Sequence, residues 1–213
     1  AIKLRRLNRG LALVVGHEST AMAAQIAAET QLQVVLLLED DASVMQARRE
    51  LIELSDPEHG QVSVQRRSDT PFPFADFAFN LIATTNDVAS QCATELIRVL
   101  RPTGGMLFID DATSQVQAAI YRDAEADGTF KWSDKALLYT RGKLSGALDW
   151  NSKNTTDLRV RWPLELLWFG GPGSKRTGGG SRAPVAAGGR NLVIGKNHLI
   201  ALDAYNGTEL WSR

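Results

Sequence analysis

The stretch LALVVG at residues 11–16 decides how the rest of the chain is interpreted, because it is apolar throughout and ends in glycine. A continuous apolar run of this length is typical of a parallel strand that is buried on both faces of a sheet. An alanine-rich segment extends from there to Ala28, and Ser19 or Thr20 can cap it as a helix. The stretch therefore predicts the first strand and the first helix of an α/β fold.

The same alternation continues toward residue 145. Apolar runs at residues 34–38, 62–65, 79–84 and 106–109 predict further strands, and helical patterns occupy residues 42–54, 91–100 and 114–126. Residues 130–132 and 136–140 then predict a pair of closing strands. Buried strands that are separated by helices indicate a doubly wound, mostly parallel sheet, and a closing pair suits its antiparallel edge. We therefore expect an α/β domain over residues 1–145.

The composition argues against several classes of protein. The 213 residues include 24 basic and 24 acidic side chains, so a nucleic-acid-binding surface is not expected. No apolar run is long enough to predict a membrane span. A single cysteine and three widely separated histidines predict neither an intrachain disulfide nor a metal site. A core strand predicted so near residue 1 leads us to expect a fragment or a processed product.

Ligands of doubly wound sheets bind outside the carboxyl ends of the strands, so the residues that follow each predicted strand are candidates for the site. Gly16 follows the first strand and permits a tight turn before a helix N-terminus. Glu39 follows the second strand and lies 23 positions beyond Gly16, near the spacing of about 20 at which an acid meets a ribose. The full cofactor-side set is Gly16, His17, Glu18, Ser19, Glu39, Asp40, Ser68, Asp69 and Thr84. The substrate-side set is Thr85, Asn86 and Asp87.

Each of these side chains also has a purely structural interpretation. Glu39 and Asp40 can act as helix caps, and Asp69 can be an ordinary turn residue. Asn86 and Asp87 are residue types that dominate turns and caps in any case. His17 has no partner acid at a recognisable spacing, so it can be a simple loop residue. The sequence identifies no catalytic base.

Two further stretches carry a family resemblance. The run PFPFADFAFNLI at residues 71–82 resembles the LPFxDxxFDxV segment of class I S-adenosylmethionine-dependent methyltransferases, and ELIRVLRPTGG at residues 95–105 resembles their ExxRVLKPGG segment. The resemblance implies a Rossmann-like methyltransferase fold with S-adenosylmethionine as the cofactor. It implies that the Gly16 loop holds the methionine part, that Glu39 binds the ribose and that Asp69 lies near the adenine.

The first loop departs from the pattern of that family, which has D/E-x-G-x-G-x-G. Here the sequence is VVGHEST at residues 14–20, so Val14 replaces the acid and only Gly16 remains of the glycines. Side chains at glycine positions keep a loop farther from its ligand. The same loop argues against a nicotinamide dehydrogenase, which has G-x-G-x-x-G.

The character of the sequence changes after residue 145. Residues 146–190 are rich in glycine and tryptophan and predict a linker. Residues 191–213 have a strand-and-turn rhythm, with Asn206-Gly207 as a strong hairpin signal. LIALDAYNGTELW at residues 199–211 resembles one repeat of a quinoprotein-type (PQQ-like) β-propeller. The resemblance implies that the rest of a β-propeller is a partner, since one blade cannot bury its faces alone. The alternative is a hairpin extension that packs on the main domain.

These observations leave three functional hypotheses. The leading one is methyl transfer from S-adenosylmethionine to an unidentified small-molecule or protein acceptor. The second is a non-catalytic, methyltransferase-like scaffold within a larger propeller protein, and the weakest is a quinone-linked oxidoreductase. An active methyltransferase would be cytoplasmic, whereas a part of an exported propeller protein would be periplasmic.

Overall fold

The computed structural model describes residues 9–16, 19–54, 61–67, 71–124, 126–149, 185–195 and 197–213. Its main feature is a seven-stranded sheet with the order β3-β2-β1-β4-β5-β7-β6. Strands β1 to β5 pair in parallel, while β7 is antiparallel to both β5 and β6. The strands are β1 (Arg9–Val15), β2 (Gln31–Leu38), β3 (Val62–Arg66), β4 (Leu81–Thr85), β5 (Met106–Asp110), β6 (Ala126–Ser133) and β7 (Ala136–Leu144). This is the predicted doubly wound sheet with its antiparallel edge.

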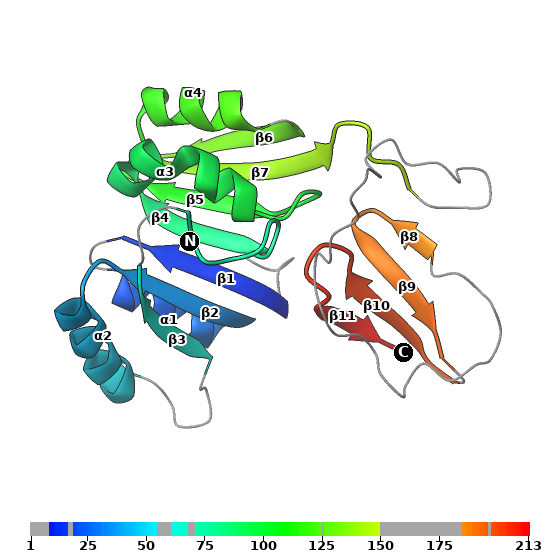
Figure 1. The fold of residues 1–213 in the computed structure, drawn as a ribbon, viewed down its shortest axis with the longest axis horizontal. Helices are drawn as coiled ribbons and strands as arrows, with labels where there is room; N and C mark the ends of the chain where they lie inside the picture. Colours follow the sequence, from blue (N-terminus) through cyan, green and yellow to red (C-terminus); the bar gives the residue numbers. More distant parts are fainter. Residues whose placement is uncertain are drawn as a thin grey trace.

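Helices cover both faces of this sheet (Figure 1). They are α1 (Thr20–Glu29), α2 (Asp41–Leu54), α3 (Asn86–Val99) and α4 (Ser114–Asp123). Alternate residues of β1 point to opposite faces, as the period of a strand requires. Leu13 packs in the core beneath α3 and α4, and Val14 in the core beneath α1 and α2. Both are fully buried, which explains why β1 is apolar from Leu11 to Val15.

The two stretches that carry the family resemblance hold each other in place. The Glu95 carboxylate on α3 accepts a hydrogen bond from the Phe72 backbone N–H (2.7 Å) and pairs with Arg98 (2.8 Å). Arg98 in turn donates to the backbone oxygens of Phe72 and Phe74 and pairs with Asp76 (2.8 Å). The segment before β4 is therefore fastened to α3 by charge-assisted hydrogen bonds.

The described residues from 185 to 213 form a second, four-stranded sheet with the order β11-β10-β9-β8 and antiparallel pairing throughout. Its strands are β8 (Val185–Ala187), β9 (Arg190–Ile194), β10 (Leu199–Asp203) and β11 (Glu209–Ser212). The predicted Asn206-Gly207 turn joins β10 to β11, and Gly207 has a positive φ of 73°. The sheet lies beside the end of β1 that is opposite its arrowhead (Figure 1).

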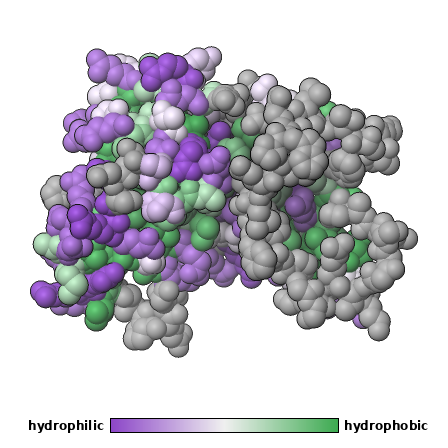
Figure 2. All heavy atoms as spheres, viewed as in Figure 1, coloured by the Kyte–Doolittle hydropathy of each residue, from purple (hydrophilic) through white to green (hydrophobic). Residues whose placement is uncertain are grey.

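Two predicted boundaries were wrong. Helix α3 begins at Asn86 rather than at residue 91, and a kink at Cys92 divides it. The small sheet begins at Val185, so β8 lies inside the stretch that was predicted as a linker to residue 190. Of that linker, residues 150–184 lie outside the described part of the chain. In the space-filling view, hydrophilic residues gather on the outer surface over α4 and α2, as expected for solvent-facing helix sides (Figure 2).

Candidate functional site at the carboxyl ends of the strands

The order of the large sheet reverses between β1 and β4, and several predicted site residues meet at that point. Gly16 follows β1 with a φ of 138°, a conformation that side chains rarely adopt. A Cβ atom at Gly16 would lie 3.2 Å from the Thr85 hydroxyl oxygen. The glycine therefore allows the loop after β1 to pass close to the end of β4. Carboxyl ends at such a switch point are the usual ligand sites of doubly wound sheets.

Two residues of the predicted cofactor-side set, Ser19 and Thr84, bind the backbone around Gly16. The Ser19 hydroxyl donates to the Gly16 carbonyl oxygen (2.7 Å), and the Thr84 hydroxyl donates to the Val15 carbonyl oxygen (2.9 Å). Both side chains are buried. Their hydroxyl protons are committed to the backbone, so Ser19 and Thr84 position the loop between β1 and α1.

The two acids after β2 have different roles. Asp40 caps α2, since its carboxylate accepts hydrogen bonds from the Ser43 backbone N–H and hydroxyl, both 2.8 Å long. The hydrogen bond from the Ser43 N–H is the main reason why the pKa of Asp40 lies below its usual value. Glu39 does not cap the helix, and its side chain is exposed, with a carboxylate oxygen 3.5 Å from a guanidinium nitrogen of Arg67. The structural interpretation therefore holds for Asp40, and Glu39 keeps a carboxylate that a ligand can reach.

The substrate-side residues lie at the start of α3. Asn86 holds this corner together, because its side-chain oxygen accepts hydrogen bonds from the Thr113 N–H (3.0 Å) and hydroxyl (3.1 Å). Thr113 is itself the N-cap of α4, so Asn86 links the end of β4 to the next helix. Asp87 is exposed in the first turn of α3, where the positive end of the helix dipole favours a carboxylate. Thr113 was not among the predicted residues.

Four predicted site residues, His17, Glu18, Ser68 and Asp69, lie outside the described residues. The roles expected of them in holding the methionine part and the adenine stay predictions. Within the described ranges, no group of three His, Cys, Asp or Glu side chains could hold a metal ion. The helices of those ranges include none that is long and apolar enough to cross a membrane.

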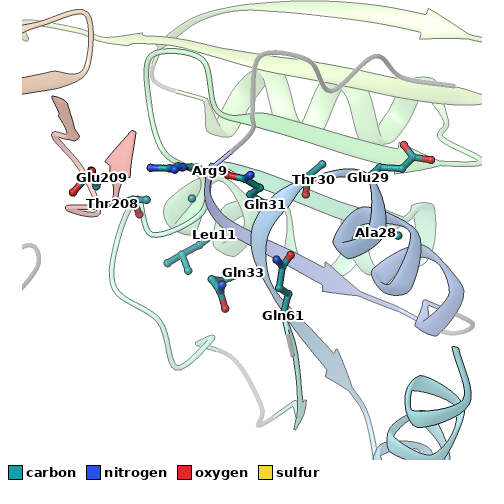
Figure 3. A pocket seen from close by; sticks show the side chains of 11 residues that line it. Arg9, Leu11, Ala28, Glu29, Thr30, Gln31, Gln33, Gln61, Thr208 and Glu209 are labelled. Carbon is teal, nitrogen blue, oxygen red and sulfur yellow. Dashed lines mark hydrogen bonds between the residues drawn. The ribbon is translucent and has the colours of Figure 1, made fainter. Parts of the chain in front are cut away.

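Two cavities of similar size lie away from these residues. A polar one of about 800 Å³ lies at the opposite, amino end of β1 and β2, where Gln31, Gln33 and Gln61 line it together with Thr208 and Glu209 of the small sheet (Figure 3). The other, of about 850 Å³, lies between α1 and the β6–β7 hairpin. Apolar side chains such as Leu81, Phe108 and Leu138 line it. None of the predicted site residues lines either cavity.

Sequence analysis missed a buried polar cluster at the amino ends of the strands. In this cluster, Asn80 and Arg101, which flank strands of the large sheet, contact Asp203 and Asn206 of the small sheet. One signal could have indicated it, because Asn80 stands where the resembled LPFxDxxFDxV segment has its second aspartate.

The strand order, the parallel core with one antiparallel edge and the helices on both faces define the Rossmann-like fold of the methyltransferase class. Solved structures with this fold include a protein of Methanococcus maripaludis assigned as an S-adenosyl-L-methionine-dependent methyltransferase. It is 12% identical, with a TM-score of 0.53 over 67% of this chain and 82% of that one. The [4+2]-cyclase SpnF is 15% identical, with a TM-score of 0.51 over 66% and 77% of the two chains. No family model matches the chain, and no curated protein matches it.

Proposed function

We propose that the α/β domain binds S-adenosylmethionine at the carboxyl ends of β1 and β2 and transfers its methyl group to an acceptor near Thr85–Asp87. The observation that carries this proposal is that the neighbouring acids Glu39 and Asp40 make different contacts. Asp40 is consumed by the cap of α2, whereas Glu39 presents an accessible carboxylate after the strand next to Gly16. An acid at this point of a doubly wound sheet is suited to a ribose diol.

The residues at this edge fit such a cofactor in a limited set of roles. Glu39 would accept hydrogen bonds from the ribose hydroxyls, and the backbone after Gly16 would face the methionine part. The cofactor supplies an activated methyl group. The protein would contribute mainly by holding the acceptor in line with that group, which is a matter of proximity and orientation. The corner formed by Asn86 and Thr113 would keep the acceptor side rigid.

The test is calorimetric titration of the full chain with S-adenosylmethionine and with S-adenosylhomocysteine. We expect micromolar binding, and we expect Glu39→Ala to weaken it at least about tenfold, since hydrogen bonds to a charged group contribute roughly 1.5–3 kcal/mol. Glu53→Ala is the matched control, because Glu53 is an exposed acid near the far end of α2. Equal loss in both variants, or no loss in either, contradicts the role of Glu39.

A second candidate function is a scaffold of the same fold that binds no cofactor. The observation that favours it is Val14, which is fully buried where the resembled loop has an acid, so that this position offers a ligand no polar group. The antiparallel four-stranded sheet is consistent with one blade of a larger β-propeller, which remains part of this second proposal. An absence of binding at millimolar S-adenosylhomocysteine would favour the scaffold. A shared fold alone does not decide between the two functions.

A further inference from the structure

The turn between β10 and β11 enters the amino end of the large sheet with its polar groups first. Asp203, at the end of β10, is fully buried and is the centre of the contact. One carboxylate oxygen, Oδ2, accepts a hydrogen bond from the Asn80 side-chain amide (2.9 Å) and pairs with Arg101 (3.0 Å). The other oxygen, Oδ1, accepts from the Tyr205 N–H within the turn (3.0 Å). One oxygen therefore shapes the turn, and the other faces the α/β domain.

Asn206 makes the reciprocal contact from the same turn. Its side-chain amide donates to the Ala78 carbonyl oxygen and to the Asn80 side-chain oxygen, both at 2.9 Å. The Asn80 oxygen also accepts from the Leu11 N–H (3.0 Å) at the start of β1. Asn80 thus donates to one residue of the turn and accepts from another, which fixes the orientation of the turn on the sheet.

The surroundings of this contact are shaped for close approach. A Cβ atom at Gly10 would lie 2.2 Å from the Asn80 side-chain oxygen, so only glycine fits there. Tyr205 packs edge-on against Phe77, with ring centroids 5.7 Å apart, and the Arg101 guanidinium lies 5.8 Å from the Tyr205 ring centroid. Arg101 also donates to the Gly189 carbonyl oxygen (3.3 Å). The turn and the amino end of the large sheet are therefore complementary, with polar groups at the centre of the contact and aromatic rings at its rim.

Burial makes the charges at this contact interdependent. Desolvation lowers the pKa of Arg101, and the Asp203 carboxylate opposes that effect. Removing either charge would leave the other one buried and uncompensated, which is the strongly destabilising case for a buried pair. An aspartate at position 80 would bring a second carboxylate within hydrogen-bond distance of Asp203. Asparagine at this position is therefore what admits an acidic turn.

We propose that the amino end of the seven-stranded sheet is a recognition site for the Asp-Ala-Tyr-Asn-Gly turn of residues 203–207, and that Asn80 and Arg101 read this turn and dock the small sheet. The small sheet depends on the docking, because its core cluster among the described residues consists of Val193, Ile200 and Leu202, with Ala201 buried beside them. Small sheets with so little core are marginal by themselves. The recognition site lies about 20 Å from the proposed cofactor site, since Asn80 and Asn86 are at opposite ends of β4.

The test is hydrogen–deuterium exchange of the full chain, followed by mass spectrometry, in the parent, two single variants, their double variant and a control variant. Asp203→Asn keeps the oxygen that shapes the turn but presents an amide to Arg101 and to the Asn80 amide. Asn80→Asp places two carboxylates face to face. We expect each single variant to speed exchange in β9 and β10 at least about 100-fold, from the usual cost of breaking a buried pair, with exchange in β4 and β5 unchanged. The double variant Asn80→Asp with Asp203→Asn restores a donor opposite a carboxylate between positions 80 and 203, although Arg101 still faces an amide, so it should recover part of the protection.

The matched control is Asp134→Asn, which makes the same chemical change at an exposed turn between β6 and β7. Unchanged exchange in both single variants would overturn the proposal, as would faster exchange that is equal in both sheets. Loss in the single variants without recovery in the double variant would overturn the pairing of Asn80 with Asp203. The readout needs no ligand, so a failure to bind S-adenosylhomocysteine leaves this result unaffected.

Discussion

At the level of single residues, the most informative difference is between the neighbours Glu39 and Asp40. Both follow β2, and spacing from Gly16 suits either of them as a ribose ligand. The structure separates them, because Asp40 accepts two hydrogen bonds from Ser43 and Glu39 accepts none from the helix. The cap holds the Asp40 carboxylate against the start of α2, so the two acids have different consequences when mutated.

We predict that Asp40→Ala lowers the midpoint of thermal unfolding and leaves the affinity for S-adenosylhomocysteine unchanged. The cause is the loss of the acceptor that satisfies the Ser43 N–H at the start of α2. Asp40→Asn is the matched variant, since asparagine caps helices as well as aspartate does. Thermal unfolding followed by circular dichroism measures the first effect and calorimetry the second. A loss of affinity in Asp40→Ala with unchanged stability would mean that Asp40 is a ligand residue.

At the level of elements, the contact between α3 and the segment before β4 joins the two stretches that resemble methyltransferase motifs. Glu95 is mostly buried and accepts hydrogen bonds from Arg98 and from the Phe72 N–H. Its hydrogen bonds with Arg98, ahead of the one from Phe72, hold the pKa of Glu95 below the usual value. A carboxyl group with a lowered folded-state pKa stabilises the protein above its unfolded pKa and loses that effect as the pH falls through the folded pKa.

We predict that Glu95→Gln destabilises the protein by about 2 kcal/mol at neutral pH, the range for hydrogen bonds to charged groups. The difference from the parent should shrink as the pH falls below about 4.3, the value of an unperturbed glutamate, because the parent then loses its own carboxylate. Urea unfolding at a series of pH values measures this. A difference that is constant between neutral and acid pH would contradict the assigned role of the charge.

The sequence predicts the elements well where periodicity is strong and poorly where tertiary contacts decide. All the strands of the large sheet were expected, because apolar runs between helices leave few alternatives. The start of α3 was placed too late, since Thr85, Asn86 and Asp87 are poor helix formers by propensity. Asn86 is held there by Thr113, 27 residues away, and local sequence does not report such a contact.

At the level of the whole molecule, the proposed cofactor site and the contact with the small sheet lie at opposite ends of the strands of the large sheet. The carboxyl ends carry the proposed cofactor site, and the amino ends carry the buried contact with the small sheet. Asn80 and Asp203 are 123 positions apart, so no pattern within either stretch could reveal that they meet. The sequence shows the identity of each residue, but only the folded structure shows that the two side chains are in contact. The described contacts of the small sheet thus lie at the amino ends, away from the proposed cofactor site.

The most direct test of the proposed cofactor site is hydrogen exchange of the full chain with and without S-adenosylhomocysteine, which shows where the ligand protects the backbone. We predict slower exchange in the peptides that contain Gly16, Glu39 and Thr85, all at the carboxyl ends, with no change at the amino ends of β1 and β2. Protection confined to the amino end, around the glutamine-lined cavity of Figure 3, would contradict the central claim. An absence of protection anywhere at saturating ligand would contradict it as well.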